Sequence, residues 1–270
     1  MCSWEAEAGR AGRTAVISSP VAGLRARPNP RSELVSQEIF GSRVPVAAVR
    51  ADWALVCAAG RDDPSRGWVP LKYLSSAVNW RPNHLVVKRF VTLRSRDLGE
   101  LLLPMGSLLE VTGRSGSALK ARLPGGGEGL APGRDLAELA AGHRRVVGFP
   151  AIAREVVGTP YLWGGKSTFG FDCSGLVQFV FGLLGSSLPR NSCEQARSGR
   201  AVRGLGSLRP LDLVFFAEGG VVDHVAIHLG SLKILHASGF VRVESLDPAS
   251  RLFRADLRSK FKLARRVVRR

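Results

Sequence analysis

The sequence predicts an α+β protein in which two small β-barrels precede a larger domain that combines an apolar helix with a series of strands. Short apolar runs broken by turns fill residues 14–77, a similar set fills residues 78–142, and a long apolar helix followed by strands lies after residue 143. We therefore expect a tail at 1–13, barrels at 14–77 and 78–142, and a third domain at 143–270.

The barrels are predicted from strand-like runs such as RVPVAAV from Arg43 and WALVCAA from Trp53, with turn residues between them. The second barrel is predicted from an internal repeat. FGS from Phe40 is echoed by MGS from Met105, and GWVPLKYL from Gly67 is echoed by GLAPGRDL from Gly129. Glycine and proline mark linkers at 79–84 and 123–133, and we expect a charged helix to follow the second linker.

The third domain is predicted from FDCSGLVQFVFGLLG, which begins at Phe171 and has the apolar pattern of a buried helix. The apolar runs LDLVFFAE, DHVAIHLG, LKILHAS and VRVESL follow it, separated by glycines or small polar residues. We expect these runs to form strands that pack against the helix.

Composition fits a folded protein of two or three modules, since 45% of the 270 residues are hydrophobic and 23% are charged. The chain has 39 Lys+Arg and 22 Asp+Glu, a net charge of +17, which would attract anionic polymers. The arginines are scattered except at 265–270, and aromatic residues do not alternate with them. We therefore expect a solvated basic surface and no nucleic-acid partner.

No apolar stretch reaches the roughly 20 residues needed to cross a bilayer, so we expect no integral membrane association. The first residues carry two glutamates and two arginines where an export signal would have an apolar core. Four cysteines, at positions 2, 57, 173 and 193, form no CxxC pair. These features predict a cytoplasmic protein, or a periplasmic or extracellular one if the true start lies upstream.

Cys173 is the strongest candidate nucleophile. Asp172 has the chemistry of a helix N-cap, and Cys173 follows it in the first helical turn. Unpaired backbone N–H groups and the helix dipole stabilise a thiolate there, and with a cationic partner they lower the pKa of a thiol from about 8.5 to roughly 3.5–7.5. The alternative is a buried structural cysteine, which suits Cys57 and Cys193 better.

A nucleophilic cysteine needs a base and a third group that orients the base. His224 opens one predicted strand and His236 closes the next, with a turn at Gly230–Ser231. In a hairpin centred on Gly230 the two histidines are direct cross-strand neighbours, with Cβ atoms about 4.5–5.5 Å apart. One imidazole would then hold the tautomer of the other. The alternative is two ordinary strand histidines.

The remaining histidines are interpreted as having no part in the chemistry. His84 and His143 lie near predicted linkers. His224 and His228 have the spacing of a zinc motif, but the residues between them are strand-like, and Val225 stands where helical zinc peptidases have a glutamate. We expect no metal and no cofactor.

Residues from about Phe149 to Leu246 resemble the NlpC-type cysteine peptidases of bacteria. The resemblance rests on the order and spacing of six motifs: GTPYLWGG, FDCSGLVQFVF, LPRNSCEQ, LRPLDLVFF, DHVAIHLG and ILHASG. It implies a papain-like α+β catalytic domain with Cys173 as nucleophile, His224 as general base and His236 as the orienting third member.

The resemblance also places Tyr161 beside the oxyanion. One motif departs from the family, which usually has Pro-Gly-Asp where this chain has Pro210, Leu211 and Asp212. We expect that change to alter a turn and not the mechanism.

The family cleaves peptidoglycan stem peptides between γ-linked D-glutamate and a diamino acid, which implies a peptidase whose partners are peptidoglycan-derived peptides. The order of the domains resembles a subgroup with two bacterial SH3-like barrels, the first of which selects a free N-terminal L-alanine. Asp172, Ser174, Glu33 and Tyr73 are then the candidates for holding that ammonium. The alternative for Glu33 and Tyr73 is an exposed loop acid and a barrel-packing aromatic.

These features favour an endopeptidase that recycles murein peptides. The alternatives are an exported cell-wall lytic peptidase acting on intact peptidoglycan, a catalytically silent wall-binding protein, and a basic nucleic-acid binder. The combination of Cys173, His224 and His236 argues against the last two. The preferred diamino acid, the role of the second barrel and the oligomeric state stay open.

Overall fold

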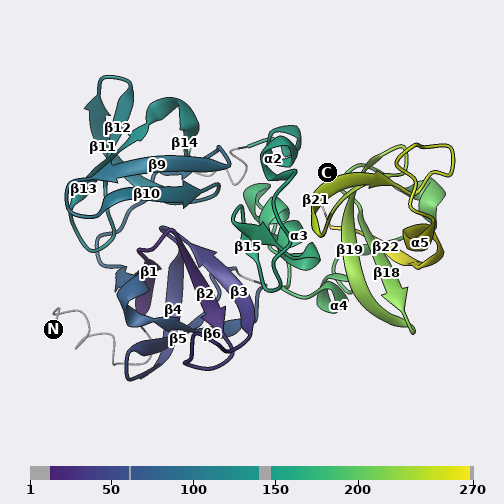
Figure 1. Cartoon of the computed structure of the whole chain (residues 1–270), viewed down its shortest axis with the longest axis horizontal. Coiled ribbons are helices and arrows are strands. Elements are labelled where there is room, and N and C mark those ends of the chain that lie inside the picture. Colours follow the sequence, from purple (N-terminus) through teal and green to yellow (C-terminus); the bar gives the residue numbers. More distant parts are fainter. Residues whose placement is uncertain (1–12, 61, 140–146, 268–270) are drawn as a thin grey trace. The chain divides into compact units, whose positions relative to one another are not determined.

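The computed structural model describes residues 13–60, 62–139 and 147–267 (Figure 1). The chain divides into two compact units, one with residues 1–59 and 64–148 and the other with residues 60–63 and 149–270. His143, the expected boundary between 142 and 143, and all but the last residue of the expected tail at 1–13 lie outside the described residues. Most of the regular structure is antiparallel β-sheet, with few helices.

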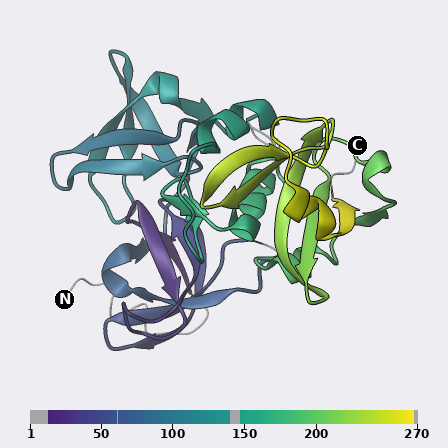
Figure 2. The ribbon, with the colours of Figure 1, turned by 45° about the vertical axis from the view of Figure 1, so that its right-hand side comes forward.

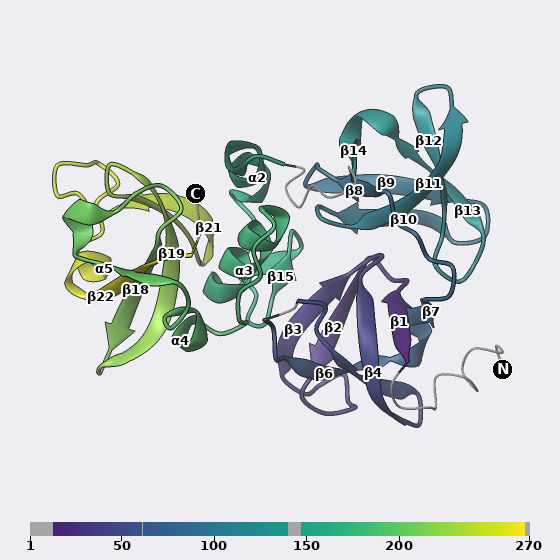
Figure 3. The same ribbon diagram turned by 180° about the vertical axis from the view of Figure 1, so that it is seen from behind.

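The first unit contains two seven-stranded antiparallel sheets (Figures 1 and 3). The first sheet has the strand order β3-β2-β6-β5-β4-β1-β7. Its elements are β1 (Thr14–Ile17), β2 (Val21–Arg25), β3 (Leu34–Ile39), β4 (Arg43–Arg50), β5 (Trp53–Cys57), β6 (Arg66–Pro70), the 3-10 helix η1 (Leu71–Tyr73) and β7 (Leu74–Ser76). Buried residues alternate along β4, β5 and β6, as expected of strands with one face on a core.

The second sheet has the order β10-β9-β13-β12-β11-β8-β14. Its elements are β8 (His84–Val86), β9 (Phe90–Ser95), β10 (Gly99–Pro104), β11 (Leu108–Ser115), β12 (Ala118–Arg122), β13 (Glu128–Pro132), η2 (Gly133–Asp135) and β14 (Leu136–Glu138). The charged helix expected after residue 133 is therefore wrong where the structure describes the chain, because η2 is one turn long and β14 pairs with β8. His84, expected in a linker, begins a strand.

The predicted internal repeat is confirmed, because the two sheets have the same strand order, each with a 3-10 helix before its last strand. The glycines that the two repeats share occupy positions where the backbone or its neighbours require glycine. Gly41 and Gly106 precede β4 and β11 with φ of 84° and 89°, a conformation that glycine adopts without strain. A Cβ atom on Gly67 would lie 2.5 Å from the Cβ of Leu24, and one on Gly129 would lie 2.4 Å from a methyl carbon of Leu93.

The two sheets of this unit meet through the turn before β4. The backbone N–H of Leu108 donates to the carbonyl of Phe40 at 3.0 Å, and the indole N–H of Trp80 donates to the carbonyl of Gly41 at 3.1 Å. Phe40 and Val16 also pack into the core of the second sheet. Apolar contact and hydrogen bonds thus join the two repeats into one compact unit.

The second unit combines helices with a six-stranded antiparallel sheet of order β17-β22-β18-β19-β20-β21 (Figures 1 and 2). Its helices are α2 (Phe149–Val156), α3 (Cys173–Leu183), α4 (Ser192–Gln195), η3 (Leu205–Ser207) and α5 (Ala255–Ser259). Its strands are β15 (Lys166–Ser167), β16 (Gly170–Phe171), β17 (Arg200–Val202), β18 (Leu213–Glu218), β19 (Val221–Gly230), β20 (Lys233–Ser238), β21 (Phe240–Ser245) and β22 (Phe261–Arg266).

Helix α3 is the central helix of this unit and packs against β19 and β20. It is buried from Cys173 to Phe181, which explains its nearly continuous apolar sequence. Its one buried amide, Gln178, donates to the Asp63 carboxylate at 2.9 Å and to the carbonyl of Leu188 at 2.9 Å. The helix, and with it the position of Cys173, is therefore fixed on all sides.

Candidate active site

The N-terminus of α3 holds the candidate nucleophile. Asp172 is the N-cap, as predicted: its Oδ1 accepts a hydrogen bond from the backbone N–H of Gly175 at 2.6 Å, and its Oδ2 accepts one from Gly164 at 2.9 Å. Cys173 is the first helical residue and is 8% exposed. A local sequence rule therefore places the thiol at the end of the helix where backbone N–H groups point outward.

Arg190, which was not among the residues predicted for the site, binds the N-cap of this helix. Its guanidinium donates to both oxygens of Asp172, at 2.9 and 2.5 Å, and to the hydroxyl of Ser174 at 3.0 Å. The guanidinium is buried and offsets the charge of the Asp172 carboxylate. Arg190 belongs to the LPRNSCEQ motif, so the sequence displayed the residue but not its pairing with Asp172.

The protonation state of Cys173 differs from the expected one. Its Sγ lies 4.0 Å from the carbonyl oxygen of Asp223, the residue before His224. Burial, reinforced by the negative charge of Asp172, raises the pKa of the Cys173 thiol to about 11. The expectation of a lowered pKa is therefore wrong for the free protein, because desolvation outweighs the backbone hydrogen bonds that favour the thiolate.

His224 and His236 are brought together, although not as direct cross-strand neighbours. In the hairpin of β19 and β20, Ile227 pairs with Leu235, which puts the register two residues away from the expected one. A shift of two residues keeps both histidines on the same face of the sheet. Nε2 of His224 lies 2.9 Å from Nδ1 of His236, and the two rings meet edge to face.

The register shift has its origin in the turn. We expected Gly230–Ser231 to form it, but Gly230, with φ of 108°, is the last residue of β19, and the two residues between the strands are Ser231, with φ of 47°, and Leu232, with φ of 57°. Positive φ at both central residues is the pattern of a tight hairpin turn whose twist matches that of its strands. Leucine is rare in this conformation, so the rule that favours glycine selected the wrong pair.

Glu244 is a third member of the chain of contacts, and sequence reasoning missed it. Its Oε2 lies 2.7 Å from Nε2 of His236, and its carboxylate also accepts two hydrogen bonds from Arg254, at 2.8 and 2.7 Å. Asp256 binds the other side of the Arg254 guanidinium. A carboxylate held in this way accepts from the imidazole and fixes its tautomer.

The hydrogen bonds define which nitrogen of each histidine carries its proton. Because Glu244 only accepts, Nε2 of His236 carries a hydrogen and its Nδ1 is an acceptor. Nε2 of His224 must then donate to that Nδ1, which leaves Nδ1 of His224 with a lone pair. Burial lowers the pKa of His224 to about 3, and it also lowers the pKa of His236. Both rings are therefore neutral near pH 7.

Tyr161 lies on the segment that leads to the nucleophile. Its backbone N–H donates to the carbonyl of Gly239 at 2.8 Å, and its side chain is partly exposed. Burial, with contributions from Cys173 and Asp172, raises the pKa of the phenol to about 12. The hydroxyl therefore stays protonated and able to donate a hydrogen bond.

Glu33 and Tyr73, the other two residues predicted to hold an ammonium, belong to the first compact unit. Glu33 is exposed just before β3, and Tyr73 ends η1 and packs against the core of the first sheet. Asp172 and Ser174 belong to the second unit. A shared role for the four residues stays a prediction.

The other histidine and cysteine candidates have no contact in common with the residues of this site among the hydrogen bonds of the described chain. The Nδ1 of His228, which is buried, donates to the carbonyl of Arg209 at 2.9 Å. Cys57 ends β5 and is half-buried, whereas Cys193 is exposed on α4 and is not the buried residue that we expected. Within residues 13–60, 62–139 and 147–267, no group of three or more His, Cys, Asp or Glu side chains is arranged to hold a metal. No helix in this part of the chain is long and apolar enough to cross a membrane.

Comparison with known proteins agrees with the interpretation of this chain as a peptidase. Residues 158–257 match the NlpC/P60 family. A gamma-D-glutamyl-L-lysine dipeptidyl-peptidase of Bacillus subtilis is 30% identical over 213 residues, which are 75% of this chain and 71% of that protein. A Bacillus cereus protein of the same name is 28% identical over 241 residues, covering 80% and 71% of the two chains.

Among solved structures, that of an NlpC/P60 family protein from Bacillus cereus superposes with a TM-score of 0.82 at 23% identity. The match covers 94% of this chain and 99% of the other. At this identity the likeness concerns the fold, and it extends over both β-sheets of the first unit as well as the unit that carries Cys173.

Proposed function

This chain belongs to the NlpC/P60 family and is a cysteine peptidase, and from that premise we propose that it hydrolyses the γ-D-glutamyl–diamino acid bond of peptidoglycan stem peptides. The observation that carries the proposal is the hydrogen-bonded chain from Glu244 through His236 to His224, together with the distance of 4.0 Å between Sγ of Cys173 and the carbonyl oxygen of Asp223, the residue before His224. Two relatives named for γ-D-glutamyl-L-lysine cleavage, each matched over 71% of its length, support the choice of bond.

The reaction starts from a neutral thiol and a neutral imidazole. As Sγ of Cys173 attacks the γ-glutamyl carbonyl carbon, its proton moves to Nδ1 of His224. His236 accepts from Nε2 of the resulting imidazolium, and Glu244 lies behind His236 and stabilises the positive charge. Burial disfavours both charged groups in the free protein, so charge separation is tied to the arrival of substrate.

The tetrahedral intermediate carries an oxyanion that needs hydrogen-bond donors. The backbone N–H of Cys173 is at the first position of α3, where the helix supplies no acceptor for it, and the protonated phenol of Tyr161 is the second candidate donor. One such donor typically contributes about 2.7–4 kcal/mol to catalysis. His224 then protonates the leaving amine, and water hydrolyses the thioester.

We further propose that the substrate carries a free N-terminal L-alanine. Ser174 and Asp172 supply acceptors for an ammonium next to the nucleophile, and Arg190 holds both in place. Because Arg190 offsets the charge of Asp172, a second carboxylate is needed to favour a cation there, and Glu33 is our candidate, with the Tyr73 hydroxyl as a further acceptor. Selection of released peptides of this kind would suit cytoplasmic recycling of wall fragments.

The finer fold assignment is part of the same proposal. We assign the sheets at residues 14–76 and 84–138 to two SH3-like barrels, within domains at 14–77 and 78–142. We assign residues 143–270 to a papain-like domain. The shared strand order of the two sheets and the packing of α3 against an antiparallel sheet support these assignments.

The test is mass spectrometry of the purified chain incubated with L-Ala-γ-D-Glu-meso-diaminopimelate, with its L-lysine counterpart and with N-acetylated copies of both. We expect L-Ala-D-Glu to be released from the free-amine peptides alone. Cys173→Ala should abolish release, whereas Cys193→Ala, which removes an exposed cysteine outside the site, should not.

Other outcomes lead to other functions. Cleavage of the acetylated peptides as well would indicate a lytic peptidase of intact wall and would remove the proposed role of Glu33. No cleavage of any peptide, together with binding to wall material, would indicate a binding protein.

A further inference from the structure

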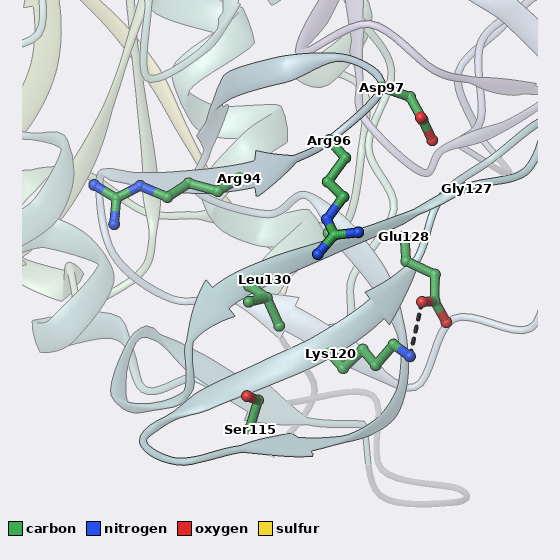
Figure 4. A pocket seen from close by; sticks show the side chains of 9 residues that line it. Arg94, Arg96, Asp97, Ser115, Lys120, Gly127, Glu128 and Leu130 are labelled. Atoms are coloured by element: carbon green, nitrogen blue, oxygen red, sulfur yellow. Dashed lines mark ion pairs between the residues drawn. The ribbon is translucent and has the colours of Figure 1, made fainter.

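The second sheet carries a pocket that the proposed catalytic chemistry does not use. The pocket has a volume of about 620 Å³, within the usual range for small-molecule sites, and it lies on the face formed by β9, β12 and β13 (Figure 4). Its lining includes three basic side chains, Arg94, Arg96 and Lys120, and one apolar side chain, Leu130. All four are exposed.

The register explains how these side chains come to share one face. Leu130 pairs with Lys120 on one side and with Arg94 on the other, so the three side chains form a row across neighbouring strands. Leu130 is 40% exposed and forms an apolar floor between the two cations. Figure 4 shows the Arg96 side chain above this row, between Arg94 and Glu128.

The first sheet provides an internal comparison, because it has the same strand order. Its equivalent row consists of Arg25, Trp68 and Leu55, with Arg25 and Leu55 on either side of Trp68. There the two residues beside the arginine are apolar and half-buried. The second repeat has replaced the leucine by Lys120 and has opened the row to solvent, which a purely structural repeat does not require.

The charges of the pocket leave one cation available. Arg94 pairs with Glu100 at 2.9 Å, and Lys120 pairs with Glu128 at 2.7 Å. These four side chains are between 47% and 76% exposed. Exposed ion pairs of this kind contribute little and exchange readily with a competing ligand. Arg96 makes no hydrogen bond or ion pair with any residue that the structure describes.

We propose that this pocket binds a zwitterionic peptide, with the ligand's carboxylate on Arg96 and Lys120 and its ammonium near Glu128 and Asp97. A guanidinium binds a carboxylate through two parallel hydrogen bonds, which favours Arg96 as the main contact. The two acidic side chains in the lining would repel a polyphosphate, so the pocket does not suit nucleic acid. The choice of a peptide rests on the proposed function, since peptides that bear both charges are its products.

The test is the binding of L-lysyl-D-alanine to the full chain, followed by backbone amide NMR and by titration calorimetry. This dipeptide has no γ-glutamyl bond, so its binding does not depend on hydrolysis. We expect shifts at Arg96, Gly129 and Leu130. Arg96→Ala and Lys120→Leu, which restores the residue of the first repeat, should each weaken binding at least tenfold.

Arg114→Ala is the matched control, because Arg114 is an exposed arginine on β11 outside the pocket. It should leave binding unchanged, and all three variants should keep the parent kcat on the tripeptide. The C-terminally amidated dipeptide should lose binding because it lacks the carboxylate.

Three results would overturn the proposal. The first is that about 10 mM dipeptide causes no amide shifts in the pocket, because even a few exposed contacts should give detectable binding at that concentration. The second is that Arg96→Ala binds the dipeptide as well as the parent does, and the third is that a short DNA strand causes the shifts and the dipeptide does not. Dipeptide binding without hydrolysis of the tripeptide would keep this site and reject the proposed function. Hydrolysis without dipeptide binding would do the reverse.

Discussion

The Glu244 carboxylate lies 2.7 Å from Nε2 of His236, on the side of the ring opposite the contact with His224. This single contact decides the tautomers of both histidines, because a carboxylate cannot donate. The basicity of Nδ1 on His224 therefore depends on a residue two side chains away. Glu244 acts as a positioning residue in this arrangement and does not touch the reacting atoms.

Replacing Glu244 with glutamine should lower kcat at least about tenfold with little change in KM. The amide can donate to Nε2 of His236, which moves that ring's proton to Nδ1 and reverses the next hydrogen bond. Holding the catalytic histidine of a serine peptidase in the wrong tautomer costs about 10⁴ in kcat. Steady-state kinetics on the tripeptide measure the effect, and Glu244→Asp should recover part of it.

Glu218→Gln is the matched control, since it removes an exposed carboxylate of the same unit that pairs with Lys260 at 2.8 Å. It should keep the parent kcat. Equal kcat for Glu244→Gln and the parent would show that Glu244 has no part in setting the tautomer.

Alkylation of Cys173 by iodoacetamide should be slow at neutral pH and should accelerate about tenfold for each pH unit between 7 and 10. The reason is the raised pKa of about 11, which leaves about 10⁻⁴ of the thiol ionised at pH 7. Peptide-level mass spectrometry measures the rate, with the exposed Cys193 as an internal control for the reagent. A fast rate that is flat from pH 6 to 8 would instead indicate a preformed thiolate–imidazolium pair.

The site was predictable from the sequence where local rules govern it. Asp172 and Cys173 follow from helix capping, and the shared face of His224 and His236 follows from strand periodicity, which an even slip in register does not change. Glu244 could not be found in this way, because its contact with His236 depends on the pairing of β20 with β21 and on a diagonal across that pair.

The pKa of Cys173 was mispredicted for a similar reason. The helix N-terminus is a local feature that the sequence displays, and it favours the thiolate. Burial depends on the packing of α3 against the sheet, which no local pattern reports. The same holds for Arg190, whose pairing with Asp172 spans 18 residues.

Acid should destabilise the protein through His224. Its pKa is lowered from 6.5 to about 3 in the folded state, so between these values the unfolded chain binds a proton that the folded chain does not. The contribution of the neutral His224 ring to the free energy of unfolding is therefore complete above pH 6.5 and is lost as the pH falls toward 3. The loss is up to about 1.4 kcal/mol per pH unit, because unfolding takes up one proton at this residue. Urea unfolding at several pH values measures the free energy of unfolding, which should depend less steeply on pH in His224→Gln than in the parent. An unchanged pH dependence would contradict a neutral buried His224.

Two glycines of α3 should respond in opposite ways to alanine. A Cβ atom on Gly175 would lie 2.1 Å from the carbonyl oxygen of Gly165, whereas one on Gly182 would meet nothing within 4 Å. Gly175→Ala should therefore lower the free energy of unfolding by about 1–3 kcal/mol, and Gly182→Ala should raise it by up to about 1 kcal/mol through helix propensity.

The same pair separates stability from catalysis. The backbone N–H of Gly175 is the group that Asp172 caps, so pushing it away from Gly165 shifts the first turn of α3 and the thiol with it. We expect kcat to fall in Gly175→Ala and to stay at the parent value in Gly182→Ala, measured at a temperature where both variants are folded. Parent-like kcat in Gly175→Ala would mean that the close approach of Gly165 to α3 does not position Cys173.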